Sequence, residues 1–246
     1  MTRRALVVFC FAFACDAPRP ASHDEAPPAH VDPTPWGGLE VQERGDGPNA
    51  VVLLHGYGAR GDDLVGFAES LAAELPTVRF AVPAAPLSLG RGARAWFPIP
   101  NGARGPESRR AVQSSIDGSR EKLEGVLRTL EHRGVPSERV VVAGFSQGAM
   151  MSLDLALRGP ERVRGVGFLS GAPLPDWPMA HAAGLPVFAS HGSSDDILPL
   201  AETEPLITRL RAANAEVELE TFQGGHSIPR EVRTTFLRWL RARFDG

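Results

Sequence analysis

The 246-residue sequence predicts an α/β fold, with a mostly parallel central sheet and helices on both of its faces. From about residue 38 onward, short apolar runs typical of strands alternate with longer segments of helical periodicity. The run Ala50–Leu54 is apolar throughout, as expected of a strand that is buried on both faces. Residues suited to catalysis directly follow predicted strands, and parallel sheets place their sites at those ends.

The predicted elements follow one another along the chain without an internal repeat. Strands are predicted over residues 39–44 (an edge strand), 50–54, 78–82, 140–143, 163–169, 186–190 and 216–222. Helices are predicted over residues 62–75, 109–133, 149–157, 201–213 and 229–243. Asp62 or Asp63 is expected to cap the first helix, and Gly134 to end the second. Residues 84–108 are rich in Pro, Gly and Arg, which predicts a long irregular loop of the kind that often carries function.

Composition indicates one globular domain, residues 38–246, with a substantial core. Hydrophobic residues make up 43% of the chain and charged residues 22%, which is ordinary for a globular protein. A net charge of −3 gives no argument for a nucleic-acid partner. The only cysteines, Cys10 and Cys15, precede this domain, so we expect neither a disulfide nor a thiolate metal site within it.

The N-terminal residues 1–14 resemble an export signal, because a basic start is followed by an apolar stretch too short to span a membrane. Cys15 follows at the position of the lipidated cysteine in bacterial lipoproteins, which the segment resembles. Residues 15–37 are rich in proline and predict an extended tether. The sequence therefore predicts a protein of the bacterial cell envelope, periplasmic or at the outer membrane, whose membrane contact is a lipid anchor only. Alternatively, Cys15 is lost within a cleaved signal peptide.

The segment from Gly144 to Gly148, Gly-Phe-Ser-Gln-Gly, has the context of a nucleophile elbow: strand, sharp turn, helix. Glycines two residues before and after Ser146 let the strand and helix approach closely, so that the hydroxyl stands above the sheet edge. The N–H of Gln147, at the helix start, is suited to stabilise an oxyanion. The alternative is an ordinary strand-to-helix turn with a capping serine.

A serine hydroxyl needs a base to take its proton and a carboxylate to orient that base. Asp195 and His226 each follow a predicted strand and occur after Ser146, the order Ser, Asp, His of α/β-hydrolases. Alternatively, Asp195 and Asp196 are helix caps and His226 is a loop histidine bonded to the backbone. Spacing alone does not choose between the two aspartates.

A second oxyanion donor is expected after the strand 50–54. The residues His55-Gly56-Tyr57-Gly58 permit a loop in which the Tyr57 N–H points toward the nucleophile. We expect His55, and likewise His191, to be structural hydrogen-bonding residues rather than second bases.

Over residues 39–244 the chain resembles the phospholipase/carboxylesterase group of α/β-hydrolases, which includes the acyl-protein thioesterases. The segments that carry the resemblance are 53–59, 62–64, 95–97, 144–150, 169–171, 191–199 and 225–228. The resemblance implies a catalytic triad of Ser146, Asp195 and His226, and favours Asp195 over its neighbour by its spacing from Gly192. It also implies an oxyanion hole formed by the backbone N–H groups of Tyr57 and Gln147.

The expected reaction is two-step hydrolysis of a small-molecule or lipid ester, with no metal or organic cofactor. Leu87, Trp96, Phe97 and Leu174 are candidates for an apolar acyl site, with ordinary packing as their alternative. Pro98 stands where the family often has an acidic residue, which leaves the substrate open. Oxygen esters such as those of short acyl chains or lysophospholipids are expected. Thioester hydrolysis and a catalytically silent binding lipoprotein are the alternatives, and the oligomeric state is not predicted.

Overall fold

Side chains of the central strands alternate between two separate cores, which explains why helices cover both faces of the sheet. In strand β2 (Asn49–Leu54), Val52 and Leu54 belong to one apolar cluster, whereas Val51 and Leu53 belong to the other. These features come from a computed structural model that describes residues 35–99 and 106–245. The described residues belong to a single compact unit, and residues 1–34 lie outside the described part of the chain.

Within the described residues the main sheet has seven strands, in the spatial order β1-β3-β2-β6-β7-β8-β9. Their bounds are β1 Val41–Arg44, β3 Val78–Pro83, β6 Val140–Phe145, β7 Gly165–Leu169, β8 Pro186–Gly192 and β9 Glu216–Phe222. The edge strand β1 runs antiparallel to β3, and every other neighbouring pair is parallel. The predicted α/β-hydrolase fold, with a mostly parallel sheet, is confirmed.

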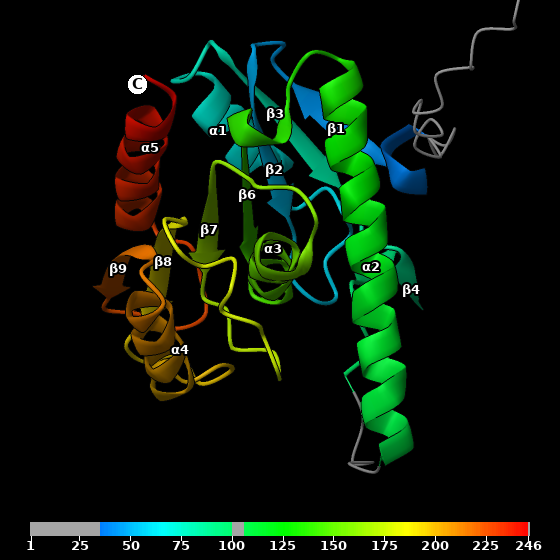
Figure 1. Ribbon diagram of the computed structural model, residues 1–246, viewed down its shortest axis with the longest axis vertical. Coiled ribbons are helices and arrows are strands. Elements are labelled where there is room, and N and C mark those ends of the chain that lie inside the picture. The colour runs from blue at the N-terminus through cyan, green and yellow to red at the C-terminus, as the bar shows by residue number, and fades with distance from the viewer. Residues whose placement is uncertain (1–34, 100–105, 246) are drawn as a thin grey trace, which may run out of the picture. The chain divides into compact units, whose positions relative to one another are not determined.

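Three helices pack on one face of the sheet and two on the other (Figure 1). The first face carries α2 (Pro106–His132), α3 (Gln147–Arg158) and α4 (Leu200–Ala212), and the opposite face carries α1 (Val65–Ala72) and α5 (Arg230–Phe244). Among the described helices, none combines the length and the apolar character needed to cross a membrane.

The start of the first helix differs from the prediction. Leu64 occupies the N-cap position of α1 without a side-chain cap, and the helix ends at Ala72, three residues earlier than predicted. The Asp63 carboxylate turns back and accepts a hydrogen bond from the Arg60 N–H at 2.5 Å. Asp63 therefore stabilises the turn before the helix and does not cap α1.

The predicted irregular loop over residues 84–108 was wrong in its first half. It contains a two-stranded hairpin, β4 (Leu87–Gly90) and β5 (Ala93–Ala95), and its last residues already belong to α2. Gly90, Arg91 and Gly92 all have positive φ angles, of 86°, 53° and 84°, which glycine adopts readily. These three residues make the tight turn between β4 and β5. The two strands are only four and three residues long, which is too short for the alternation of polar and apolar residues to indicate a strand in the sequence.

The short 3₁₀ turn η1 (Pro35–Gly38) packs against α2, although the sequence predicts that residues 15–37 form a tether. The Trp36 N–H donates to Thr129 Oγ1 at 2.9 Å, and the Arg133 guanidinium lies 4.5 Å from the Trp36 ring centroid. The last residues of the predicted tether are thus part of the domain surface. Its earlier residues, and the predicted signal 1–14 with Cys15, lie outside the described residues.

Candidate active site

Ser146 occupies a strained turn between β6 and α3, with φ 56° and ψ −118°. The two flanking glycines are required by space. A Cβ on Gly148 would lie 2.0 Å from the Leu54 carbonyl oxygen, and one on Gly144 would lie 2.3 Å from the backbone of Gly148. The predicted geometry of strand, sharp turn and helix is confirmed, and it fixes the Ser146 backbone at the carboxyl end of β6.

Asp195 and His226 are joined by a hydrogen bond of 2.7 Å between Asp195 Oδ2 and His226 Nδ1. The other carboxylate oxygen, Oδ1, accepts the N–H groups of Ile197 (3.0 Å) and Leu198 (2.9 Å). A carboxylate only accepts hydrogen bonds, so the proton of this contact belongs to Nδ1, and in the neutral form of the ring the lone pair is on Nε2. Of the two candidate aspartates, Asp195 is the one held against the histidine, whereas Asp196 is exposed.

The pKa of Asp195 is lowered from its ordinary value. Burial alone would raise the pKa, but hydrogen bonds from the Leu198 amide, the His226 ring and the Ile197 amide outweigh burial and favour the ionised form. The carboxylate therefore stays charged at neutral pH and orients the imidazole.

Ser146 and His226 line the same cleft, which has a volume of about 410 Å³. The His226 ring packs against Phe145, with ring centroids 4.7 Å apart. Among the described hydrogen bonds none joins Ser146 Oγ to His226, a contact that is often long without substrate and tightens when substrate binds. The structure thus brings the predicted nucleophile and the predicted base to one opening.

Both predicted oxyanion donors line this cleft. Gln147 begins α3, where the first backbone N–H groups have no partner within the helix. Tyr57 lies in the loop after β2, and that loop is tied to β5 by two backbone bonds. The Gly58 N–H donates to the Arg94 carbonyl at 2.9 Å, and the Arg94 N–H donates to the Ala59 carbonyl at 2.8 Å. The hairpin missed in the sequence therefore orders the predicted oxyanion loop.

His55 supports the same loop from within the core, where it is completely buried. Its Nδ1 lies 2.8 Å from the Gly56 carbonyl oxygen, and its Nε2 accepts the Ala85 N–H at 3.0 Å. Burial lowers the pKa of His55, so the ring is neutral, with the proton on Nδ1. The prediction that His55 is a structural residue is confirmed.

His191 holds the loop that carries Asp195. The ring is fully buried, and its Nε2 donates to the Leu198 carbonyl at 2.7 Å and lies 3.4 Å from Asp195 Oδ2. Its Nδ1 has no hydrogen-bond partner in the described part of the chain. The ring is enclosed by the loop that it holds and does not line the cleft, so it fits a structural histidine, as predicted.

The four predicted acyl-site residues separate into one that lines the cleft and three that do not. Phe97 is in the cleft wall. Trp96 is fully buried behind the wall, where its Nε1 donates to the His55 carbonyl at 2.9 Å. Leu174 belongs to the core cluster on the face of α3, and Leu87 lies in β4. The sequence reveals an apolar side chain but not the direction in which it points.

The remaining apolar wall comes from residues that sequence reasoning missed. Met150 follows Ser146 by one helical turn, so the elbow itself could have indicated it. Ile197 and Leu198 accompany Asp195 because their amides bind its carboxylate. Tyr57, Ile99 and Ile197 are 43%, 54% and 64% exposed, and they form the apolar rim of the cleft.

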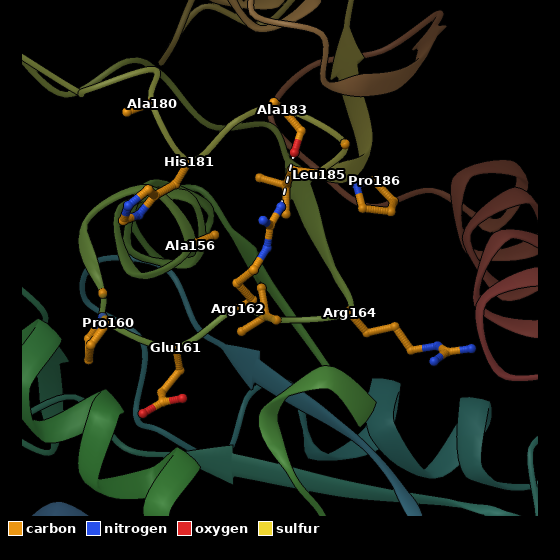
Figure 2. Close-up of a pocket in the computed structure, with 13 residues that line it drawn as sticks. Ala156, Pro160, Glu161, Arg162, Arg164, Ala180, His181, Ala183, Leu185 and Pro186 are labelled. Atoms are coloured by element: carbon orange, nitrogen blue, oxygen red, sulfur yellow. Dashed lines mark hydrogen bonds between the residues drawn. The ribbon is translucent and has the colours of Figure 1, made fainter.

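A second cavity, of about 370 Å³, lies at the opposite ends of the strands and holds none of the predicted site residues (Figure 2). It lies between the α3–β7 connection and the segment that leads into β8. Arg162 and His181 contribute polar groups, and Arg162 Nη2 donates to the Ala183 carbonyl at 3.0 Å. The two cavities thus differ in chemistry, and only the first unites a serine with a carboxylate-bound histidine.

Comparison with known proteins agrees with this geometry. Residues 38–241 match the profile of the family described as phospholipase/carboxylesterase. Acyl-protein thioesterase 1 of Eremothecium gossypii is 29% identical over 215 residues, which cover 80% of this chain and 88% of the relative. The same-named protein of Mycosarcoma maydis is 30% identical over 214 residues, covering 76% and 88%.

Solved structures show the same fold. The crystal structure of esterase PE8 superposes with a TM-score of 0.74 at 29% identity, covering 83% of this chain and 98% of the esterase. A carboxylesterase from Mesorhizobium loti gives a TM-score of 0.68 at 23% identity, covering 83% and 91%. The chain therefore belongs to the phospholipase/carboxylesterase family of α/β-hydrolases, enzymes that hydrolyse ester or thioester bonds.

Proposed function

We propose that this enzyme hydrolyses carboxylic esters of small-molecule or lipid alcohols through an acyl-enzyme formed on Ser146, with His226 and Asp195 completing the triad. The proposal depends mainly on one observation: the histidine that opens into the cleft beside Ser146 is bound through Nδ1 to a buried carboxylate, at 2.7 Å. That contact leaves Nε2 as a proton acceptor, which a serine hydroxyl needs in order to attack.

In the acylation step, His226 Nε2 removes the Ser146 proton while Oγ bonds to the ester carbonyl carbon. The carbonyl oxygen gains negative charge, which the Tyr57 and Gln147 N–H groups stabilise. Cleavage of the carbon–oxygen bond releases the alcohol, which takes its proton from the His226 imidazolium.

In the deacylation step, His226 removes a proton from water as the water attacks the acyl carbon. The bond to Ser146 Oγ then breaks, and the serine regains its proton. Asp195 remains a carboxylate throughout and stabilises each imidazolium that forms. The cycle is balanced without a metal or an organic cofactor.

The apolar cleft supports an acyl group as the part of the substrate that is bound. Met150, Phe97 and Leu198 offer hydrocarbon surface next to Ser146. An acyl-enzyme has the same structure whether it forms from an oxygen ester or a thioester. The relatives named acyl-protein thioesterase 1 favour thioesters as a second class of substrate.

Two measurements test the proposed function. Labelling with a fluorophosphonate, followed by peptide mapping, should give an adduct on Ser146. The absence of any adduct would support the alternative of a catalytically silent binding protein. Comparing kcat/KM for an oxygen ester and a thioester that share one acyl chain then decides between the two substrate classes. A higher kcat/KM for the thioester would mean that thioesters, and not oxygen esters, are the preferred substrates.

Activity should fall as the pH is lowered from neutral into the acid range, because a protonated imidazole cannot accept the serine proton. The lowered pKa of Asp195 keeps the carboxylate ionised in this range, and the lowered pKa of His55 keeps that ring neutral. The loss should therefore follow a single proton, about tenfold in kcat/KM per pH unit at the acid limit. Initial rates from pH 4 to 9 measure it, with return to neutral pH as the control for unfolding. A profile that is flat to pH 4 would exclude a histidine base.

We also propose that Cys15 anchors the protein through lipid, as its position in the sequence suggests. Two or three acyl chains hold a protein on a membrane stably, whereas one does so only marginally. Cys15→Ala should move the enzyme out of the membrane fraction or leave its signal unprocessed, with the catalytic rate of the domain unchanged. Mass spectrometry of the mature N-terminus is the direct measurement. An unmodified N-terminus beyond Cys15 would contradict the anchor and leave the esterase proposal unaffected.

A further inference from the structure

The Gln147 side chain makes two buried hydrogen bonds that the elbow itself does not require. Its Oε1 accepts the Trp96 N–H at 2.8 Å, and its Nε2 donates to the Phe97 carbonyl at 2.7 Å. The residue is only 3% exposed. One amide side chain thereby binds the backbone of two consecutive residues, Trp96 and Phe97, which lie 51 and 50 positions earlier in the chain. It accepts from one N–H and donates to one carbonyl, as the backbone of a neighbouring strand would.

The segment held in this way carries part of the cleft wall. Trp96 is anchored further, because Ser119 Oγ donates to its carbonyl at 2.5 Å and its Nε1 donates to the His55 carbonyl. Phe97, whose side chain lines the cleft, has its carbonyl held by Gln147. Trp96 would keep its other hydrogen bonds without Gln147, whereas Phe97 would lose the bond that holds its carbonyl. The direction of the Phe97 side chain therefore depends more strongly on Gln147.

Gln147 also supplies one of the two proposed oxyanion donors through its backbone N–H. The residue thus contacts the proposed position of the substrate carbonyl through its main chain, and positions an apolar wall through its side chain. We infer that the Gln147 side chain is a positioning group that sets acyl-chain preference, by holding the Phe97 wall at a fixed place relative to Ser146. This inference rests on the proposed function.

The physical reason is the small size of the hydrocarbon contacts involved. Discrimination by one methylene in an apolar pocket amounts to roughly tenfold to two-hundredfold in kcat/KM, and only where the wall is fixed. An acetyl group is too short to use the wall fully, whereas a hexanoyl group extends along it. Loosening Phe97 should therefore reduce hydrolysis of the hexanoyl ester more than that of the acetyl ester.

A double-mutant cycle tests this role. Gln147→Met keeps the backbone N–H and the side-chain length but removes both hydrogen bonds, and Phe97→Ala removes the wall. We expect each to lower the hexanoyl-to-acetyl ratio of kcat/KM by about tenfold or more. The double variant should resemble Phe97→Ala alone, because the glutamine acts through the phenylalanine. Gln42→Met, at an exposed position on β1, is the matched control and should leave the ratio unchanged.

Other outcomes overturn the inference. A ratio that stays constant while thermal stability falls would give Gln147 a purely structural role. Ratios that multiply in the double variant would show that the two residues act independently. If Gln147→Met does not fold, Gln147→Leu, which also keeps the backbone N–H and lacks both side-chain hydrogen-bonding groups, makes the same comparison. Failure of the proposed function is distinguishable, because the unaltered enzyme would then hydrolyse neither ester.

Discussion

Replacing Ser146 by alanine should reduce turnover of any ester substrate by roughly a thousandfold or more, because the acyl-enzyme loses its only oxygen for attachment. Fluorophosphonate labelling should disappear together with activity. The structure also predicts that the fold survives, since alanine retains the Cβ atom of serine. The backbone strain at φ 56° is thus the same in both proteins. The free energy of unfolding should change by no more than about 0.5 kcal/mol.

The control for this variant is Ser114→Ala, which changes an exposed serine on α2. It should hydrolyse esters and react with the probe like the unaltered enzyme. Steady-state kinetics and urea unfolding of the three proteins, run side by side, separate lost chemistry from lost structure. Near-normal turnover by the Ser146 variant would mean that the nucleophile lies elsewhere.

Asp195→Asn should cost on the order of a thousandfold to ten-thousandfold in kcat. The surrounding amides explain why so small a change has so large an effect. The N–H groups of Ile197 and Leu198 both donate to Oδ1, so the side-chain oxygen of the asparagine has to take that position. The new NH₂ group must then face His226, whose Nδ1 can no longer keep its proton. The proton moves to Nε2, where it prevents the ring from accepting the serine proton.

Asp196→Asn is the matched control, because it makes the same chemical change one residue away. Asp196 is exposed, and α4 begins only at Leu200 with Pro199 at its N-cap, so no helix start depends on this carboxylate. Its activity should stay within about twofold of the unaltered enzyme, as is usual for surface substitutions. Equal, mild losses in both variants would point to a different carboxylate partner for the histidine.

The main elements of the fold could be predicted because their sequence patterns are strong. Strand β9 begins and ends at the predicted residues, and the run Ala50–Leu54 forms a central strand whose side chains enter both cores. The β4–β5 hairpin was missed because its strands are short and half exposed, and because backbone bonds to the loop at Gly58 stabilise them. Such bonds join distant segments and leave no local pattern.

In the site, too, residues with a strong sequence signal were predicted correctly, and residues whose position depends on distant contacts were not. Residues with distinctive chemistry, such as Ser146 and His226, stand in the expected places at the carboxyl ends of strands. The choice of Asp195 over Asp196 came from family resemblance. The two residues are chemically identical, and only the path of the loop decides which side chain points toward the histidine. The apolar wall was predicted least well. Trp96 and Phe97 are neighbours of similar character, yet one is buried behind the wall and the other forms it.

The apolar rim of the cleft has a practical consequence for assays. Tyr57, Ile99 and Ile197 expose hydrocarbon surface at the entrance, and the interior behind them is apolar as well. A detergent monomer has the same alkyl chain as a lipid ester and is held by the same contacts. Detergent added to dissolve long-chain esters will therefore compete with the substrate and raise its apparent KM. Rates for different acyl chains are comparable only when they are measured with soluble esters, in buffer free of amphiphiles.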